Sequence, residues 1–355
     1  MNKVVLLAPT PPPAGGIAGW TMRMLEASLK NEWRVEVVDE KLLGNTETFG
    51  EGSQRHLSDE VKRTFRIWAD LRKKLKDKDV KIVHSCIPST TFAMMREYVC
   101  AVITHQKKRQ FIMHFRCTTP NTTQGKLGHF VFKKICKISD HIIVLNTPSL
   151  KHVESVCNTS VEIIPNFVDV SEISESKVIK EKVKVALYVG GVIETKGCSL
   201  ICDIAKEFTD IQFRMVGKAE QSIIDKAAPL TNVVLTGPKN KNEVKEELKE
   251  ADLFLFLSHF RGEGFSNSLA EAMAFGIPCI VTDWAANADM IEDKGGSIIC
   301  VDDFDVAIKA MSSELDYERR MNQSKFNIEK IRNSYASNIV LDKYVECYER
   351  LCINA

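Results

Sequence analysis

The chain has 355 residues, of which 44% are hydrophobic, and its 48 Lys and Arg almost balance its 47 Asp and Glu. A chain of this length forms about two domains, and its composition is that of ordinary globular proteins. No run reaches the length of about 18 apolar residues that a membrane-spanning helix needs, and the apolar N-terminal run is too short for a signal peptide. We therefore expect a cytoplasmic protein and exclude a transmembrane or secreted one.

Two further features of composition bear on partners and cofactors. The eleven cysteines include no Cys-x-x-Cys pair, so we interpret them as reduced core residues and not as disulfides or zinc ligands. Residues 1–170 carry 25 Lys and Arg against 17 Asp and Glu, whereas residues 171–355 carry 23 against 30. The excess of positive charge in the first half suits an anionic partner. The alternative is that the charges of two similar halves have diverged without a functional reason.

Short apolar runs that predict strands alternate with stretches that predict helices along the whole chain. In the first half, strands are predicted at residues 3–8, 34–39, 80–85, 110–115, 141–145 and 161–164. In the second half, they are predicted at residues 184–190, 211–216, 232–235, 253–257, 278–282 and 297–301. This alternation is typical of doubly wound parallel sheets, so we predict an α/β fold with two such domains.

The polar segment 171–182 has no strong apolar periodicity and is predicted to be a linker. The domains then comprise residues 1–170 and 183–336, with the binding cleft expected between them. Near the end of the chain, apolar residues recur at helical spacing, which predicts a final amphipathic helix over 337–355.

Two candidate site residues lie in the first domain. Gly16 belongs to the proline- and glycine-rich turn Pro9–Gly19, between the first strand and a helix. Its Gly-Gly-x-x-Gly spacing differs from the Gly-x-Gly-x-x-Gly of dinucleotide-binding proteins, and a purely structural turn remains the alternative. His114 stands at the carboxyl end of the strand 110–115, where open α/β sheets place ligands, and a buried histidine with satisfied hydrogen bonds is the alternative.

Two predicted helices of the first domain, 61–76 and 126–138, are basic and amphipathic. The apolar stripe of the first is Val61, Phe65, Trp68, Leu71 and Leu75, and a solvated outer helix explains it. The stripe of the second is Leu127, Val131, Ile135 and Ile138, which leaves Phe132 beside lysines. An aromatic residue next to a basic face favours contact with an anionic membrane, and a plain core-facing helix is the alternative.

The segment 263–278 carries the strongest functional signal of the second domain. Ser266 is predicted to cap a helix that Gly276 ends, after a buried strand. A helix N-terminus favours phosphate, and the two carboxylates Glu263 and Glu271 suit hydroxyls at different parts of one elongated ligand. These features together predict a nucleotide diphosphate sugar as the ligand.

Lys196 is a second candidate in this domain, because it lies between the end of a strand and the following helix. Its ammonium group suits a diphosphate and the charge that develops on such a leaving group. The alternative is an ordinary solvated lysine. Asp303 and Asp305 have the spacing of a metal site, but they are interpreted as a helix N-terminus.

Four motifs in this order resemble the retaining family 4 glycosyltransferases with the GT-B fold. The segment from Glu263 to Met273 resembles their Glu-x7-Glu motif, and 164–169 resembles the Pro-Asn-Gly-Val-Asp that closes their first domain. The loop 190–197 resembles their Gly-Arg-x4-Lys-Gly loop, and Pro13–Ile17 resembles their first glycine-rich turn. Four matches at domain-scale spacing are far more specific than any one of them.

The resemblance implies two Rossmann-like domains facing across a cleft, with the acceptor in the first domain and the donor in the second. It implies that the final helix packs back on the first domain. The implied donor contacts are Glu271 with the ribose, Gly264, Phe265, Ser266, Gly16 and Lys196 with the diphosphate, and Glu263 and His114 with the sugar. Gly191 stands where the family has an arginine, and Arg261 on the loop of Glu263 is a candidate substitute.

We therefore predict a retaining glycosyltransferase of the hexosyltransferase type. Its donor is a nucleotide diphosphate sugar, with UDP favoured and GDP left open, and its acceptor is a lipid-linked saccharide in bacterial surface polysaccharide or lipopolysaccharide biosynthesis. The resemblance implies donor binding without a metal or other cofactor. We expect peripheral contact with the inner face of the membrane and no nucleic acid partner. A GT-B sugar-nucleotide epimerase and a non-catalytic nucleotide-sugar binding protein remain alternatives.

Overall fold

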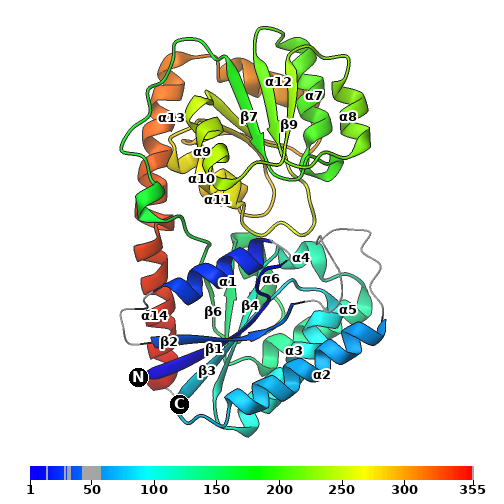
Figure 1. Cartoon of the computed structure of the whole chain (residues 1–355), viewed down its shortest axis with the longest axis vertical. Coiled ribbons are helices and arrows are strands. Elements are labelled where there is room, and N and C mark those ends of the chain that lie inside the picture. The colour runs from blue at the N-terminus through cyan, green and yellow to red at the C-terminus, as the bar shows by residue number, and fades with distance from the viewer. Residues whose placement is uncertain (13–14, 28, 30–32, 42–56, 354–355) are drawn as a thin grey trace. The chain divides into compact units, whose positions relative to one another are not determined.

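The chain forms two compact units, shown in Figure 1 as a computed structural model that describes residues 1–12, 15–27, 29, 33–41 and 57–353. The N-terminal unit comprises Met1–Asn166 and Val340–Ala355, and the C-terminal unit comprises Phe167–Ile339. Each unit has a six-stranded parallel sheet with helices packed on it. The predicted fold class of two doubly wound α/β domains is therefore confirmed. Pro13 and Ala14, in the predicted glycine-rich turn, lie outside the described residues.

The N-terminal sheet has the strand order β2-β1-β3-β4-β5-β6. Its strands are β1 (Asn2–Ala8), β2 (Trp33–Asp39), β3 (Val80–Ile87), β4 (Gln110–Phe115), β5 (His141–Val144) and β6 (Val161–Ile163). Its helices are α1 (Gly16–Glu26), α2 (Leu57–Lys74), α3 (Thr91–Gln106), α4 (Thr119–Thr122), α5 (Gly125–Ile138), α6 (Thr147–Glu154) and most of α14 (Ser337–Ile353). The inner strands are buried on both faces, which explains their continuous apolar sequences.

Alternate residues of these strands face two different helical layers, because successive side chains of a strand point to opposite faces. Val5, Leu7 and Phe111 belong to one core with α2, α3 and α5, which lie along the same side of the sheet in Figure 1. Residues of the other parity, such as His84 and His114, pack against α1 and α14 instead. The final helix therefore completes the core of the N-terminal unit.

The exposed faces of α2 and α5 differ from those predicted. Phe132 is fully buried and stacks on His152, with ring centroids 4.5 Å apart, so the prediction that it lies beside the lysines is wrong. The exposed apolar residues of α5 are Leu127 and Phe130, and the Lys134 ammonium lies 5.5 Å from the centroid of the Phe130 ring. On α2, Val61 and Phe65 of the predicted apolar stripe are exposed, whereas Ile67 and Leu71 are buried.

A buried aromatic cluster joins α14 to the N-terminal sheet. The Tyr348 hydroxyl lies 2.7 Å from His84 Nδ1, and His84 Nε2 lies 3.0 Å from His114 Nδ1. The Trp20 ring lies edge-on to both imidazoles. Burial, together with the nearby Arg116 guanidinium, lowers the pKa of His84 to about 3 and holds the pKa of His114 well below its usual range. Both imidazoles are therefore neutral near pH 7.

The C-terminal sheet has the strand order β12-β11-β10-β7-β8-β9. Its strands are β7 (Val185–Val189), β8 (Gln212–Val216), β9 (Val233–Gly237), β10 (Leu253–Phe256), β11 (Cys279–Thr282) and β12 (Gly296–Ile299). Its helices are α7 (Cys198–Glu207), α8 (Gln221–Ala227), α9 (Lys241–Glu250), α10 (Asn267–Ala274), α11 (Asn287–Ile291), α12 (Phe304–Ser313) and α13 (Tyr317–Lys330). Short helical turns occur at Val170–Glu172, Glu194–Lys196 and Ile331–Tyr335.

Several polar side chains fix the backbone of the C-terminal unit. The Asn327 amide donates to the carbonyls of Ile277 and Gly295, at 2.8 and 2.9 Å. It thus joins α13 to the segments that directly precede β11 and β12. Arg320 donates to the carbonyls of Lys180 and Glu181. The segment predicted as a linker thus hydrogen-bonds to α13.

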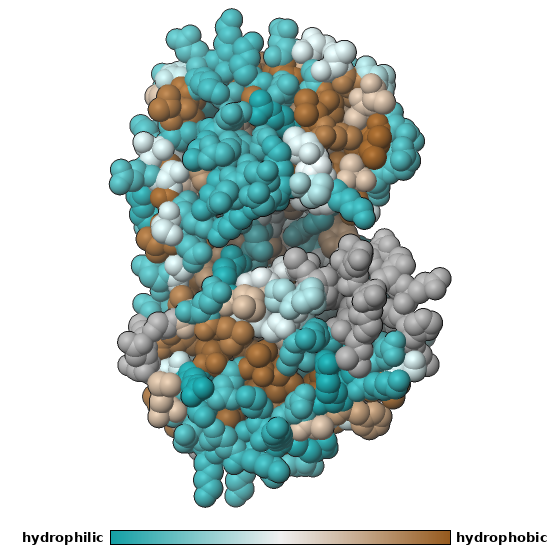
Figure 2. Space-filling model, viewed as in Figure 1, coloured by the Kyte–Doolittle hydropathy of each residue, from teal (hydrophilic) through white to brown (hydrophobic). Residues whose placement is uncertain are grey.

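The outer surface is mostly hydrophilic in the view of Figure 2. Within the described part of the chain, no helix combines the length and the apolar character that a membrane span requires. The apolar residues that remain exposed on the N-terminal unit include Phe65 of α2, Phe92 and Met95 of α3, and Phe130 of α5.

The two neutral histidines predict a loss of stability at mildly acidic pH. In the unfolded chain each histidine takes up a proton near pH 6.5, whereas burial prevents this in the folded unit, so protonation favours unfolding. The free energy of unfolding should fall as the pH drops below about 6.5, by up to about 1.4 kcal/mol per pH unit for each histidine. Urea titrations followed by tryptophan fluorescence at pH 7 and pH 5 measure this fall.

The same titrations of His84→Gln identify the source of the effect. Because one of the two buried imidazoles is gone, the pH dependence of this variant should be weaker than that of the wild type. An unchanged pH dependence would show that other groups cause the acid sensitivity.

Candidate functional site

The candidate site of the C-terminal unit lies where its strand order reverses. β7 and β10 are neighbours at the centre of the sheet, with β8 and β9 on one side and β11 and β12 on the other. In open α/β sheets, ligands bind outside the carboxyl ends of the strands at such a reversal. Lys196 follows β7 and Glu263 follows β10, so the two residues lie at this edge.

The loop between β10 and α10 has the local structure that its sequence predicts. Ser266 is extended and caps α10, with its Oγ accepting a hydrogen bond from the Leu269 amide at 3.2 Å. The helix ends at Ala274, and Gly276 follows with φ of +70°, a conformation that favours glycine. The positive end of the α10 dipole therefore lies at Ser266, next to Gly264 and Phe265.

An ion pair joins the two loops of the site. The Lys196 ammonium donates to the Glu263 carboxylate, and both side chains are mostly buried. The ammonium also lies 4.8 Å from the centroid of the Phe260 ring. A positive charge is thus held near the N-terminus of α10, and a carboxylate balances it. A diphosphate that enters would compete with Glu263 for this ammonium group.

Gly197 determines how closely the Lys196 loop approaches β10. Its φ is +77°, and a Cβ atom at this position would lie only 2.2 Å from the Leu257 carbonyl oxygen. On the same loop, the Thr195 carbonyl accepts a hydrogen bond from the His259 amide at 2.9 Å. A glycine is therefore required after Lys196 for the ammonium to reach Glu263.

The other residues predicted in this unit lie around the same loop. The Phe265 side chain is buried against Tyr335, edge-to-face with centroids 5.4 Å apart, so it stabilises the loop. Glu271 is partly exposed on α10, and Arg261 is exposed two residues before Glu263. A Cβ atom added at Gly191 would have no neighbouring atom within 4 Å. An arginine at Gly191 would therefore meet no steric obstacle at its first carbon.

The sequence of the C-terminal unit matches the profile of a known protein family. The profile of the family "Glycosyl transferases group 1" matches residues 169–329, which include Lys196, Glu263 and Glu271. The C-terminal unit is thus similar in sequence to the group 1 glycosyltransferases. A 2-deoxystreptamine N-acetyl-D-glucosaminyltransferase from Niallia circulans is 35% identical over 135 residues, which are 35% of this chain and 33% of that protein. The match thus spans about a third of the length of that relative.

Solved structures share the fold of this chain over its whole length. A sucrose-phosphate synthase from Thermosynechococcus elongatus superimposes with a TM-score of 0.81 at 14% identity, covering 100% of both chains. Anabaena HepE in complex with UDP superimposes with a TM-score of 0.72 at 11% identity, covering 99% of this chain and 100% of HepE. At such low identity the likeness shows the GT-B fold alone.

The two candidates of the N-terminal unit lie in different environments. Gly16 is the first residue of α1 and lines a cavity. His114 is fully buried in β4, and both of its ring nitrogens have partners, His84 at 3.0 Å and the Arg116 guanidinium at 3.2 Å. The predicted contact of His114 with a donor sugar remains a prediction.

Two groups of side chains in the described part of the N-terminal unit have the composition of metal ligands. They are His84, Cys86 and His114, and His141, Glu162 and Cys347. Hydrogen bonds account for the first imidazole pair, and the adjacent Arg116 charge disfavours a cation there. In the second group, His141 Nε2 lies 2.7 Å from the Glu162 carboxylate.

Asp303 caps α12 by accepting a hydrogen bond from the Val306 amide, as the sequence predicts.

A cavity of about 530 Å³ in the N-terminal unit was not predicted from the sequence. Among the described residues that line it, the charged ones are Glu40, Glu60, Arg63 and Arg96. The one sequence signal for this site is the position of Glu40 directly after β2, at the carboxyl edge of the sheet.

Gly197 and Gly191 form a matched pair for testing the loop. Gly197→Ala should lower the free energy of unfolding of the C-terminal unit by more than about 2 kcal/mol, because it adds a clash with the Leu257 carbonyl to an unfavourable positive φ. Gly191→Ala should change it by no more than about 0.5 kcal/mol, because space is open there. Chemical denaturation measures both values, and equal losses would contradict the role of Gly197.

Proposed function

We propose that the protein transfers a sugar from a nucleotide diphosphate sugar to an acceptor hydroxyl, with retention of anomeric configuration. The observation that carries this proposal is the Lys196–Glu263 pair beside the capped N-terminus of α10, at the reversal of strand order. A cation and a helix dipole together suit a diphosphate and its leaving-group charge. The match of residues 169–329 to the profile of group 1 glycosyltransferases supports the same reaction class.

The proposed donor contacts follow the positions of the side chains. Lys196 and the N-terminus of α10 bind the diphosphate, whereas Glu271, farther along the helix, accepts hydrogen bonds from the ribose. Glu263, released from Lys196 by the phosphates, accepts hydrogen bonds from the sugar. Arg261 supplies a second cation in place of the arginine that Gly191 replaces. UDP is the proposed nucleotide, because HepE, which shares the fold, was solved with UDP.

In the proposed reaction, the bond between the anomeric carbon and the diphosphate oxygen breaks, and a bond to the acceptor oxygen forms on the same face. The departing phosphate oxygen takes the proton of the acceptor hydroxyl, so no separate protein base is needed. Lys196 stabilises the negative charge that develops on this oxygen. The helix dipole and Lys196 supply the charge that a metal ion supplies in other transferases, so donor binding is proposed to be metal-independent.

The proposed acceptor is a lipid-linked saccharide, reached by contact of the N-terminal unit with an anionic membrane. α5 has no acidic residue, and all four of its lysines are exposed. They are Lys126, Lys133, Lys134 and Lys137. Leu127 and Phe130 are 63% and 57% exposed among them. Apolar side chains surrounded by lysines are the composition of helices that bind membrane surfaces.

A thermal shift screen tests the donor. UDP-sugars should raise the melting temperature by mass action, and GDP- and ADP-sugars should raise it less. Lys196→Ala should weaken UDP binding about tenfold or more, because it removes the ammonium at the diphosphate. Lys309→Ala, an exposed lysine of α12, is the matched control and should bind UDP as the wild type does. Equal affinities of the two variants would contradict the site.

Measurements of turnover distinguish the proposed transferase from an epimerase and from a non-catalytic binding protein. Release of UDP only when an acceptor is present would exclude an epimerase, because an epimerase needs the donor alone. Donor binding without turnover across a broad set of acceptors would support a non-catalytic binding protein.

Vesicle sedimentation tests the membrane surface. The double variant Leu127→Ser with Phe130→Ser should bind phosphatidylglycerol vesicles at least fivefold more weakly than the wild type, because it removes the apolar side chains that enter the interface. Phe304→Ser is the control, since Phe304 is an exposed phenylalanine of the C-terminal unit. Equal binding of both variants, or binding to neutral phosphatidylcholine vesicles that matches binding to anionic ones, would contradict the proposal.

A further inference from the structure

The cavity of the N-terminal unit lies at the reversal of strand order in that sheet. β1 and β3 are neighbours at this point, and the cavity is bordered by Pro9 after β1, Pro88 after β3 and Glu40 after β2. The first turns of α1 and α3 complete it. Its volume of about 530 Å³ is that of a site for a small molecule.

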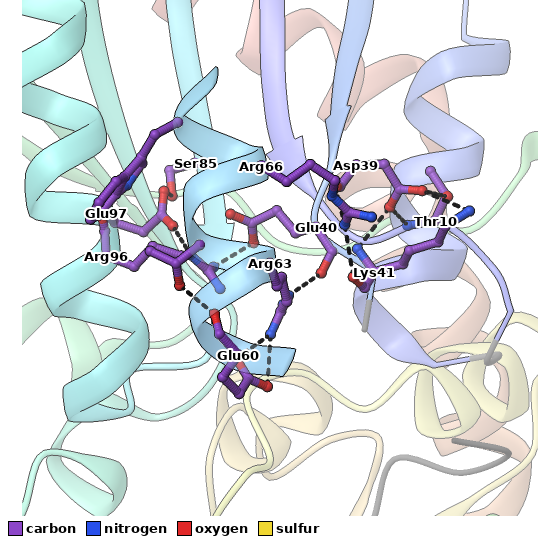
Figure 3. A network of polar contacts seen from close by, with 12 residues as sticks. Thr10, Asp39, Glu40, Lys41, Glu60, Arg63, Arg66, Ser85, Arg96 and Glu97 are labelled. Carbon is purple, nitrogen blue, oxygen red and sulfur yellow. Dashed lines mark hydrogen bonds and ion pairs between the residues drawn. The ribbon is translucent and has the colours of Figure 1, made fainter. Parts of the chain in front are cut away.

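Buried charges form one wall of this cavity. Figure 3 shows Glu40 and Glu97 on either side of the Arg96 guanidinium. Arg96 Nη2 donates to Glu40 Oε2 and Arg96 Nε donates to Glu97 Oε1, both at 2.7 Å. The Ser85 hydroxyl donates to the other oxygen of Glu97 at 2.9 Å. Two carboxylates thus share one guanidinium.

A second pair lies beside this wall, at the start of α2. Arg63 Nη1 donates to both Glu60 carboxylate oxygens, at 3.0 and 3.3 Å, and Arg63 Nε donates to the Glu40 carbonyl at 2.8 Å. The Glu60 and Arg63 side chains are 14% and 12% exposed, so a ligand can reach them. A carboxylate and a guanidinium side by side offer an acceptor and a donor to adjacent hydroxyl groups.

The distribution of charge disfavours an anionic ligand in this cavity. Both arginines that line it already bind carboxylates, Arg96 with Glu40 and Glu97, and Arg63 with Glu60. A phosphate group would have to compete with these carboxylates and would be repelled by them. Around this cavity the three carboxylates of Glu40, Glu60 and Glu97 outnumber the guanidinium groups of Arg63 and Arg96, which offsets the positive ends of α1 and α3. The site of the C-terminal unit has a single Lys196–Glu263 pair beside a helix N-terminus.

One polar atom of the wall has no hydrogen-bond partner. Glu40 is 2% exposed, and its Oε1 accepts no hydrogen bond from a described residue. Burial and the neighbouring Glu97 carboxylate hold the pKa of Glu40 above its usual range, despite Arg96. A hydroxyl group suits this carboxyl in either state, because it donates to the ionised form and accepts from the protonated form.

The rest of the lining is mostly apolar. Ile17, Ala18 and Ala93 contribute to the walls, and Phe92 is 49% exposed at the cavity. An aromatic ring beside carboxylates suits a saccharide, whose C–H faces are apolar while its hydroxyls are polar.

We infer that this cavity binds an uncharged, polyhydroxylated ring of the acceptor, with adjacent hydroxyls on Glu60 and Arg63 and one face of the ring against Phe92. This inference rests on the proposed function, because it names the substrate class of the acceptor site. Glu60 and Arg63 select the ring, and the lack of an uncommitted cation among the described lining residues selects against a phosphorylated one.

Saturation-transfer NMR with neutral ring compounds tests the inference. The probes are glucose, galactose, N-acetylglucosamine and myo-inositol, with inorganic pyrophosphate as an anionic competitor. At least one neutral probe should bind to the full chain, and excess pyrophosphate should not displace it. Glu60→Gln and Phe92→Ala should each weaken that binding at least fivefold. Both residues are at least partly exposed, so these variants are expected to fold.

Glu36→Gln is the matched control. Glu36 lies on β2, pairs with Lys3 and Lys74, and does not line the cavity. Its binding of the neutral probe should equal that of the wild type. The inference is wrong if no neutral probe binds, if pyrophosphate displaces the probe, or if Glu60→Gln and Phe92→Ala bind it as strongly as Glu36→Gln.

The stabilisation by UDP, measured on the same variants, distinguishes the two proposals. If no UDP-sugar stabilises the wild type, the proposed function fails, whatever the neutral probes do. If UDP-sugars stabilise all variants equally and no neutral probe binds, only the inference about the cavity fails.

Discussion

Both candidate sites depend on one constraint, the reversal of strand order within a parallel sheet. Helices that follow the two central strands leave toward opposite faces, so their loops diverge and leave a crevice at the carboxyl edge. In the N-terminal unit α1 packs on one face and α3 on the other. Apolar side chains cover both faces of the sheet, so the polar side chains of the site lie at its carboxyl edge. Lys196 and Glu263 gather at one such edge, and Glu40, Glu60 and Arg63 at the other.

The two crevices use ion pairs in different ways. In the C-terminal unit a single Lys196–Glu263 pair lies beside a helix N-terminus, so an anionic ligand finds both a dipole and an ammonium group. In the N-terminal unit each arginine of the lining is matched by at least one carboxylate, which leaves hydrogen-bonding capacity without surplus positive charge. One crevice therefore suits a diphosphate, and the other suits neutral hydroxyls.

Local chemistry determined what could be predicted from the sequence. The strand alternation and the caps at Ser266 and Asp303 depend on neighbouring residues, and the structure confirms them. The exposed aromatic of α5 was predicted wrongly, because the buried stripe is rotated toward Phe132, which stacks on a histidine of α6. The Glu40–Arg96 pair joins residues 56 positions apart, so no local pattern predicts it.

The close contact at Gly197 has a consequence for how the Lys196–Glu263 pair can open. Because its backbone lies against the Leu257 carbonyl, and the Thr195 carbonyl accepts from the His259 amide, the two loops that carry Lys196 and Glu263 cannot slide independently. The ion pair between them therefore opens by rotation of the two side chains and not by motion of one loop past the other. A ligand that competes with Glu263 for the Lys196 ammonium therefore meets a backbone that is already in place.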